Sequence, residues 1–408
     1  MLSVDGVTAA DLAVSAPAET RRVKTAVAAA GISSFALLYA PQPVLPQLAA
    51  QYHLDPGSAS LAVSVATGAL ALSVLPIAAL SEIVGRRPVI LTSVIASAVL
   101  GLLLPLAPSY GVLLVLRALQ GIAIAGFPGV AAAYLVEQLG KKGVAAAVGA
   151  MIAGNTVGGM LGRLAAGFSA EAFGYHGALT VVGGLGLVFT VLTVLSLPPA
   201  TRARSRSSLG RPLRGVLAGV AAALGKPILL AQYAVALLAM GSFVALYNAA
   251  GFRLTGAPLD LSPAIASLVF LAYAMGSVSS ATVGRLVGRF GRVRSAVGAL
   301  LVTAAGVLLT LPDSLVVVVL GFVVLTGGFF AAHAVANSWA AAEAPEGARG
   351  QASGTYTLSY YLGSSVGGTV GSVIYAKAGW PWLVAATVCW LLLAVATVAV
   401  TARRGAAM

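Results

Sequence analysis

Long apolar runs fill the sequence between residues 25 and 402, and short polar or proline- and glycine-containing segments separate them. A helix that crosses a bilayer needs about 20 mostly apolar residues. The runs predict twelve such helices, at approximately 25–50, 59–81, 88–108, 110–137, 144–168, 176–197, 228–252, 262–284, 293–312, 315–341, 351–377 and 380–402. Because twelve is an even number, both termini are expected on the same side of the membrane.

The same pattern divides the chain into two six-helix bundles. Between the sixth and seventh runs, residues 201–214 are polar, basic and serine-rich, a composition that favours a flexible linker. The N-terminal residues lack the apolar core of a secretory signal, which favours a mostly disordered tail. The predicted organisation is a tail at 1–24, a bundle at 25–198, a linker at 199–227, a bundle at 228–402 and a tail at 403–408.

Composition and charge support a membrane protein. The chain is 59% hydrophobic and 9% charged, whereas soluble domains carry roughly 25% charged residues. Of the 24 Lys and Arg residues, 20 fall in the tails, the linker and the loops on one side of the predicted bundles. The positive-inside rule makes that side cytoplasmic. A nucleic-acid partner is not expected, because the basic residues lie at the ends of apolar runs and form no water-exposed basic face.

A loop motif occurs twice, at residues 78–87 (AALSEIVGRR) and 284–293 (GRLVGRFGRV), 206 residues apart. It resembles the loop signature of the major facilitator superfamily, Gly-x-Leu-x-Asp-Arg-x-Gly-Arg-Arg. Ala78 stands at the first glycine, Glu82 at the acid of the first copy, and Gly288 at the acid of the second. The resemblance implies an all-α membrane protein of twelve transmembrane helices in two pseudo-symmetric bundles, which transports small molecules by alternating access. Resemblance to bacterial drug and metabolite exporters, similar to arabinose-efflux-type permeases, rests on residues 328–333 (GFFAAH) and 360–363 (YYLG).

Charged residues at the predicted cytoplasmic ends are candidates for a gate. In the family, this loop is thought to brace the cytoplasmic side when the protein is open outward. The alternative is that these charges only anchor the loops on the positive side. The candidate gate residues are Glu82, Gly85, Arg86, Arg87, Glu137, Arg289 and Arg292, with the second copy, near Glu343, expected to be weaker.

Two arginines lie inside predicted spans. Arg117 and Gln120 match the family pattern Arg-x-x-Gln-Gly, which implies a role in shaping the cavity or in handling protons or anions. An arginine inside a span costs at least about 2.5–3.5 kcal/mol unless it faces a partner or water, although Arg117 could instead snorkel to the outer interface. At Arg163 both interpretations, interface snorkelling and cavity function, stay open.

Glycines recur at matching places in the two bundles. Residues 154–159 (GNTVGG) resemble the family's antiporter signature Gly-Pro-x-x-Gly-Gly, with Asn155 in place of proline, and residues 363–368 (GSSVGG) repeat it. Small residues allow close helix packing, and the resemblance adds an export direction. Ordinary packing is the alternative. The candidate packing residues are Gly154, Gly158, Gly159, Gly363, Gly367 and Gly368.

Polar and aromatic residues inside the spans predict a binding site for an amphipathic organic compound. Pro41, Pro43 and Pro46 should bend or unwind the end of the first helix, which is tolerated where backbone lines protein or a water-filled cavity. The candidate substrate-binding residues are Tyr39, Gln42, Arg117, Gln120, Asn155, Tyr247, Asn248, Tyr273, His333, Asn337, Tyr356 and Tyr360.

Proton coupling has two candidates, His333 and Arg117. The pKa of a histidine side chain, near 6.5, permits proton exchange at physiological pH, but a neutral histidine bonded between helices is the alternative. No Asp or Glu lies in the middle of a predicted span.

The sequence predicts no enzyme, cofactor, metal site or disulfide. The phosphate-binding Gly-x-x-x-x-Gly-Lys-Ser/Thr spacing and the His-Glu-x-x-His motif are absent, and Cys389 is the single cysteine. The favoured function is proton-coupled efflux of a small drug or metabolite by a monomer in the inner membrane, with both termini cytoplasmic. The alternatives are a facilitator or importer of nutrients in the same fold and, from another class, a membrane-embedded enzyme or receptor.

Overall fold

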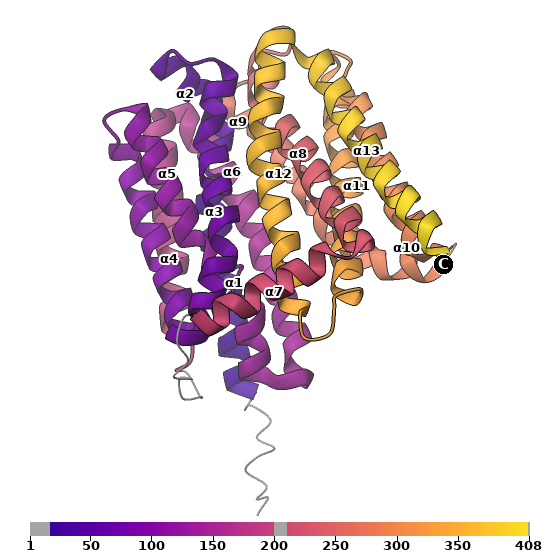
Figure 1. Ribbon diagram of the computed structural model, residues 1–408. Coiled ribbons are helices and arrows are strands. Elements are labelled where there is room, and N and C mark those ends of the chain that lie inside the picture. Colours follow the sequence, from indigo (N-terminus) through magenta and orange to yellow (C-terminus); the bar gives the residue numbers. More distant parts are fainter. Residues whose placement is uncertain (1–16, 200–209, 407–408) are drawn as a thin grey trace, which may run out of the picture.

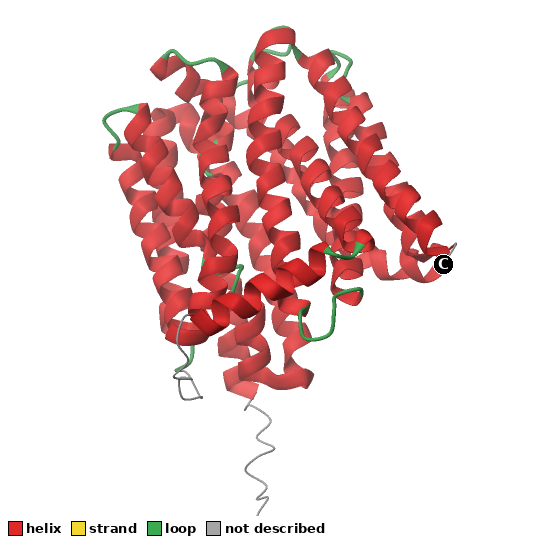
Figure 2. Ribbon diagram, in the orientation of Figure 1, coloured by secondary structure: helices red, strands yellow, loops and turns green. Residues whose placement is uncertain are grey.

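The computed structural model describes residues 17–199 and 210–406, and within these ranges every regular element is a helix (Figure 2). The first half comprises α1 (Pro17–Tyr39), η2 (Gln42–Val44), α2 (Leu45–Tyr52), α3 (Pro56–Val84), α4 (Arg86–Leu103), η3 (Leu104–Leu106), α5 (Tyr110–Ala125) and α6 (Ala131–Ser196). The second half comprises α8 (Pro227–Thr255), α9 (Pro263–Ser267), η4 (Leu268–Tyr273), α10 (Ala274–Leu309), α11 (Leu315–Ala342), α12 (Arg349–Ala378) and α13 (Trp380–Ala406). Between them lies α7 (Gly210–Leu224).

The helices run between two ends of the molecule, with the two halves side by side (Figure 1). We call the end with Arg86, Arg292 and the last turn of α13 the basic end, and the end with Tyr52 and Trp380 the opposite end. Eight helices in the described ranges are long and apolar enough to cross a membrane, and shorter apolar helices accompany them. The total of twelve crossings stays a prediction.

Two of the long helices contain a reversal. Residues 144–196 of α6 form one apolar stretch of 53 residues, far longer than the roughly 20 that span a bilayer. Gly174 within it has a φ of +63°, and Tyr175 beside it bonds to Tyr52 at the opposite end. In α10, Gly291 has a φ of +78° and separates two helical stretches. Glycine suits both positions because it has no Cβ to oppose a positive φ.

Corresponding turns repeat in the two halves at the spacing of the loop motif. Gly85, between α3 and α4, has a φ of +99°, and Gly291 stands 206 positions later with a φ of +78°. Each glycine is followed by an arginine that pairs with a glutamate 51 residues further on. The duplication predicted from the loop motif therefore extends to backbone conformation and to ion pairing.

The three prolines interrupt the first helix as the sequence predicts. α1 ends at Tyr39, a short 3-10 turn follows, and α2 begins at Leu45. Proline has no N–H to continue the helical ladder, and the last carbonyls of any helix lack intrahelical donors. The end of α1 therefore presents backbone oxygens to the interior of the first half.

Glycine stripes hold two helix pairs in close contact. A Cβ at Gly154 or Gly158 of α6 would overlap the backbone of Ala28 or Ile32 in α1. In the second half, a Cβ at Gly363 or Gly367 of α12 would overlap the backbone of α8 at Leu237 or Gly241. The absence of side chains allows this close backbone approach in both halves.

Two segments differ from the sequence-based expectation. α1 begins at Pro17, so residues 17–24 are helical, while residues 1–16 lie outside the described ranges. In the expected flexible linker, residues 210–224 form α7, which crosses the basic end (Figure 1). Its apolar residues Val216 and Ala223 are buried and lie seven positions apart on the same helical face, so burial of that face stabilises the helix.

Candidate functional site

Arg117 of α5 is fully buried and holds together three helices of the first half. Its Nε donates to the carbonyl of Ala62 in α3 at 2.6 Å, and its Nη atoms donate to Leu37, Leu38 and Gln120. Leu37 and Leu38 are in the last turn of α1, where intrahelical donors are missing. The guanidinium thus uses four of its five N–H groups. Arg117 is therefore a structural residue that links α1, α3 and α5.

Arg163 of α6, by contrast, lies where the two halves meet. It is 1% exposed, its Nε donates to Gln42 Oε1 at 2.6 Å, and its Nη1 donates to the Gly159 carbonyl at 2.7 Å. Gln42 Nε2 donates in turn to Asn248 Oδ1 of α8 at 2.7 Å. A buried chain of hydrogen bonds therefore runs from α6 through the 3-10 turn after α1 into the second half.

Aromatic rings enclose the Arg163 guanidinium. Its central carbon lies 4.2 Å from the ring centroid of Tyr39, 4.4 Å from that of Tyr273 and 5.3 Å from that of Phe270. Tyr39 belongs to the first half, and the other two rings belong to η4 of the second. Rings at this distance attract a cation through their quadrupole, so they stabilise the charge without neutralising it.

A cluster of rings continues from this point into the second half. Phe243 stacks on Phe329 at 4.1 Å, and Tyr247 stacks on Phe270 at 5.5 Å. The Tyr247 hydroxyl shares a 2.7 Å hydrogen bond with Thr326. The interior of the second half is thus apolar and aromatic, with isolated polar groups.

His333 of α11 lies at the edge of this cluster toward α12. Its Nδ1 is 3.0 Å from the Tyr356 hydroxyl, which also reaches the His333 carbonyl at 3.2 Å. The imidazole stacks on Phe329 at 6.1 Å and packs against Tyr360 at 4.8 Å. His333 is therefore an interhelical hydrogen-bonding residue, and one ring nitrogen is left for another partner.

The described carboxylates all lie toward the two ends. Asp55 caps the start of α3, where hydrogen bonds from Ser58 hold the pKa of the Asp55 carboxyl below its usual value.

The described ranges contain three ion pairs, and none of them involves Arg117 or Arg163. Within the same ranges, no group of three or more His, Cys, Asp or Glu side chains could hold a metal ion.

At the basic end, each ion pair stays inside its own half. Arg86 pairs with Glu137 at 3.1 Å, and Arg292 pairs with Glu343 at 3.2 Å. Arg87 donates to the Pro198 carbonyl at 2.7 Å, also within the first half. Among the residues that the structure describes, no hydrogen bond or ion pair joins these two clusters.

At the opposite end, polar contacts tie the halves to each other. The carboxylate of Glu171 in α6 accepts from the Ser262 hydroxyl at 2.8 Å and from the Ala264 amide at 3.1 Å. Ser262 caps the start of α9, so the contact joins the last turns of α6 before Gly174 to the second half.

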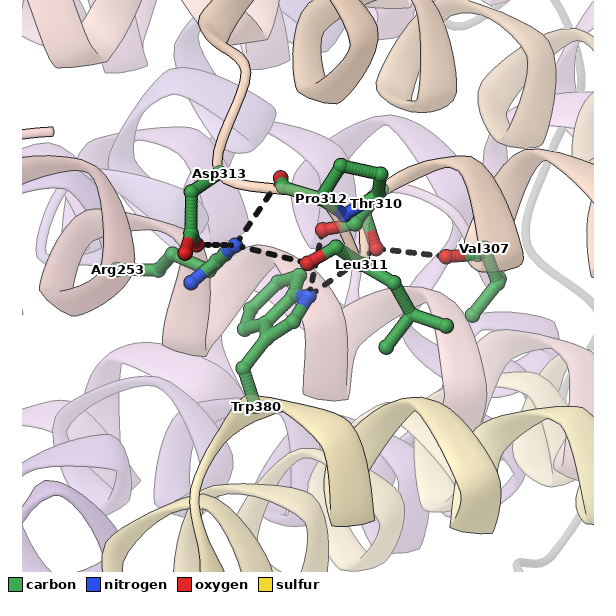
Figure 3. Close-up of polar contacts among 7 residues, drawn as sticks. All are labelled: Arg253, Val307, Thr310, Leu311, Pro312, Asp313 and Trp380. Atoms are coloured by element: carbon green, nitrogen blue, oxygen red, sulfur yellow. Dashed lines mark hydrogen bonds and ion pairs between the residues drawn. The ribbon is translucent and has the colours of Figure 1, made fainter. Parts of the chain in front are cut away.

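The second half has its own polar cluster at the opposite end (Figure 3). Arg253 donates to Asp313 at 2.8 Å and to the carbonyls of Leu311 and Pro312, and its guanidinium lies 5.2 Å from the Trp380 ring. Trp380 Nε1 donates to the Thr310 carbonyl at 2.9 Å. This cluster joins α8, the turn after α10 and the start of α13.

The predicted site residues fall into separate groups. Tyr39, Gln42, Asn248 and Tyr273 surround Arg163, and Tyr247, His333, Tyr356 and Tyr360 belong to the ring cluster. Gln120 bonds to Arg117 and to the Ser97 carbonyl. The others lie apart: Asn155 faces Gly31 on the α1–α6 seam, Asn337 and Glu82 are exposed, and Arg289 lies over the neighbouring Phe290 ring.

The sequence-based prediction did not include Arg163 among the site residues, nor Phe243, Phe270 and Thr326. The signal for Arg163 was present, since a charged residue six positions inside a span needs a partner. Its partners, however, come from the 3-10 turn and from the other half, and sequence spacing does not reveal them.

Comparison with known proteins assigns the class. The sequence profile of the Major Facilitator Superfamily matches residues 27–259 and 233–406. The chain therefore belongs to this family of membrane transporters, and it is a multi-pass membrane protein of the all-α fold that the family shares.

Individual relatives agree with that assignment. The chain is 36% identical to the uncharacterized MFS-type transporter YybF of Bacillus subtilis, over 89% of this chain and 88% of that one. It is 35% identical to the inner membrane transport protein YnfM of Escherichia coli, over 88% and 85%. A solved structure of a bacterial homologue of the human lysosomal transporter Spinster, inward-facing and unoccupied, has a TM-score of 0.76 at 17% identity and covers 95% of this chain and 98% of that one.

Proposed function

We propose that this transporter carries a small amphipathic organic compound across the inner membrane by alternating access. The observation that carries the proposal is the uneven distribution of contacts between the halves. Hydrogen bonds join the halves at Gln42–Asn248 and Glu171–Ser262, whereas the ion pairs of the basic end stay within one half. Such an arrangement is expected of one of two states that differ by rocking of the halves.

The orientation follows from the charges. In the sequence, 20 of the 24 Lys and Arg residues fall in the segments expected on the side of the basic end, and the positive-inside rule supports a cytoplasmic location for that end. The state described is then the one open to the cytoplasm. In the outward-open state, we expect the basic-end clusters of the two halves to approach each other and to act as the gate.

The substrate class follows from the ring cluster. Stacked Phe and Tyr side chains with isolated hydrogen-bonding groups suit a compound that has a flat apolar body and few polar atoms. A monomer is sufficient, because both halves that surround the site belong to one chain.

Export driven by proton exchange is the favoured direction and coupling. His333 supplies a basic side chain within the ring cluster, with one ring nitrogen held by Tyr356 and the other available to a proton. Its protonation on one side of the membrane and release on the other would couple the proton gradient to substrate movement.

The test is substrate flux in liposomes that contain the purified chain, measured with and without a pH gradient over a panel of amphipathic compounds. We expect flux that the pH gradient drives, and a flattened pH profile in His333→Gln. Tyr356→Phe is the matched control, because it removes the hydroxyl bonded to the imidazole and leaves the imidazole in place. Flux with an unchanged pH profile in His333→Gln would contradict the coupling, and no flux for any compound would contradict transport itself.

The absence of carboxylates from the middle of the described spans favours a second candidate, an uncoupled facilitator or importer in the same fold. In that case the flux would follow the substrate gradient alone, and an uncoupler would leave it unchanged.

A further inference from the structure

The Arg163 guanidinium is a buried positive charge without an acidic partner. Among the described residues it makes two hydrogen bonds, one to the side chain of Gln42 and one to the Gly159 carbonyl. A guanidinium has five N–H groups, so three make no bond within the described part of the chain. A charge inside the membrane is costly unless it pairs with an opposite charge, with backbone oxygens or with water.

A second observation points to a ligand at the same place. The Nδ2 of Asn248 is fully buried and has no hydrogen-bond partner among the described residues, and the same holds for the Ser64 hydroxyl. Both atoms lie near Gly368, since a Cβ built there would be 3.0 Å from Asn248 Nδ2 and 3.5 Å from Ser64 Oγ. A larger side chain at Gly368 would fill this position. Buried polar groups are normally bonded, and Asn248 is linked to the guanidinium through Gln42, so the unpaired groups point to a missing acceptor next to this hydrogen-bond chain.

The side-chain amide of Gln42 links Arg163 to Asn248, and a ligand carboxylate could take the place of its carbonyl. Its Oε1 accepts from Arg163 and its Nε2 donates to Asn248. A neutral carbonyl leaves the charge of a guanidinium unpaired, whereas a carboxylate pairs with it and can accept two parallel hydrogen bonds. Gln42 stands in the 3-10 turn between Pro41 and Pro43, and a ligand carboxylate that replaces its carbonyl on Arg163 requires the Gln42 side chain to rotate away.

The surroundings complete the site. Tyr39, Tyr273 and Phe270 pack around the guanidinium and lead into the ring cluster of the second half. They stabilise the positive charge and provide an apolar surface for the body of a ligand.

We propose that Arg163, with Asn248, is the recognition site for an organic anion, whose carboxylate takes the place of the Gln42 carbonyl and whose aromatic or aliphatic body lies against Tyr39, Tyr273 and Phe270. The proposal rests on the proposed transport function and specifies its substrate class. Arginine suits this role because its planar fork matches a carboxylate. Arg117 does not qualify, because four of its N–H groups are bonded within the first half.

The test measures by calorimetry how tightly three compounds bind to the purified full chain. The compounds share a naphthalene ring: 2-naphthaleneacetate, its primary amide and 2-(2-naphthyl)ethylamine. The carboxylate is expected to bind at least about tenfold more tightly than the amide or the amine. Arg163→Gln should remove this preference, and Arg163→Lys should restore part of it.

A milder variant keeps the test decisive if Arg163→Gln does not fold. Asn248→Leu removes the unpaired donor and keeps the guanidinium, and it should weaken carboxylate binding about fivefold or more relative to amine binding. Gln47→Leu is the matched control, because Gln47 bonds to the Ala170 carbonyl within the first half, and it should bind all three probes as the natural chain does.

The outcomes separate this inference from the transport function. Equal binding of carboxylate and amide, or binding of none of the probes, would overturn the anion site. Carboxylate binding that depends on Arg163 without flux in liposomes would overturn transport and leave the site standing. Flux of the amine or amide without a carboxylate preference would overturn the anion site and leave the transport function standing.

Discussion

Arg117 and Arg163 are the same residue type, both buried and both without a carboxylate, yet their surroundings differ. The Arg117 region lies within one half, and its guanidinium donates to backbone carbonyls that the end of α1 and the α3 helix supply. The Arg163 region spans both halves, and apart from the Gly159 carbonyl its contacts are side chains and rings. Backbone oxygens are fixed by the fold, whereas side chains can exchange partners. The difference separates an arginine that builds a bundle from one that is free to respond to a ligand and to the neighbouring bundle.

The largest expected effect on stability comes from removing the hydrogen bonds of the Arg117 guanidinium. Arg117→Gln leaves the carbonyls of Leu37, Leu38 and Ala62 without their buried donor, and an unsatisfied buried group costs about 1–3 kcal/mol. We expect the free energy of unfolding in detergent to fall by about 3 kcal/mol or more. Arg163→Gln, measured in the same denaturant titration, should cost clearly less. An equal loss in the two variants would remove the distinction between the two regions.

Breaking the link between the halves should shift their equilibrium without unfolding either one. Gln42→Leu removes the bonds to Asn248 and Arg163, and a shift of about 1–3 kcal/mol, or 5–150-fold, toward separation at the opposite end is expected.

Distances between spin labels measure this shift. In a Cys389→Ser background, labels at Pro108→Cys and Ser314→Cys report on the opposite end, and labels at Glu82→Cys and Gly288→Cys report on the basic end. In Gln42→Leu the first distance should lengthen and the second shorten, whereas Gln47→Leu, which breaks a bond within one half, should change neither. Unchanged distances in both variants would show that Gln42 does not link the halves.

The rings around Arg163 should contribute a smaller, separable amount. A double-mutant cycle of Arg163→Gln and Tyr39→Leu is expected to give a coupling of about 0.5–2 kcal/mol in the free energy of unfolding, because a desolvated cation over a ring is stabilised by that amount. The cycle of Arg86→Ala with Tyr39→Leu serves as the reference and should give a coupling near zero, because Arg86 lies at the basic end and bonds to Ala133 and Glu137. Similar couplings in the two cycles would mean that Tyr39 acts on the bundle as a whole.

The ion pairs of the basic end should matter least for stability. Arg86 and Glu137 have side chains about one-third exposed, and Arg292 and Glu343 are nearly half exposed. Exposed pairs contribute about 0.2–1 kcal/mol, so Arg86→Ala should cost slightly more than Arg292→Ala, and high salt should reduce both losses. A loss above about 2 kcal/mol in the free energy of unfolding from either substitution would show that these pairs are important for stability.

The sequence predicts the family and the helix interruptions of this molecule better than the contacts of its buried arginines. The interruption by prolines after Tyr39 and the family assignment are confirmed, because they depend on local backbone chemistry and on a repeated motif. The start of α1 and the helix at 210–224 were predicted wrongly, because a polar flanking sequence can be helical when a few apolar side chains find a surface. The partners of Arg117 and Arg163 could not be predicted, since they are backbone oxygens and side chains that only the folded arrangement brings near.

Gln42 and Asn248 are related by the same 206-residue step as the repeated loops, and they bond to each other. In a symmetric dimer of two identical six-helix chains, a residue on the two-fold axis touches its own copy, and any substitution there changes both partners at once. Joining the copies into one polypeptide lifts that restriction. A glutamine can then face a shorter asparagine, and its amide can bond at once to that asparagine and to an arginine of the first half.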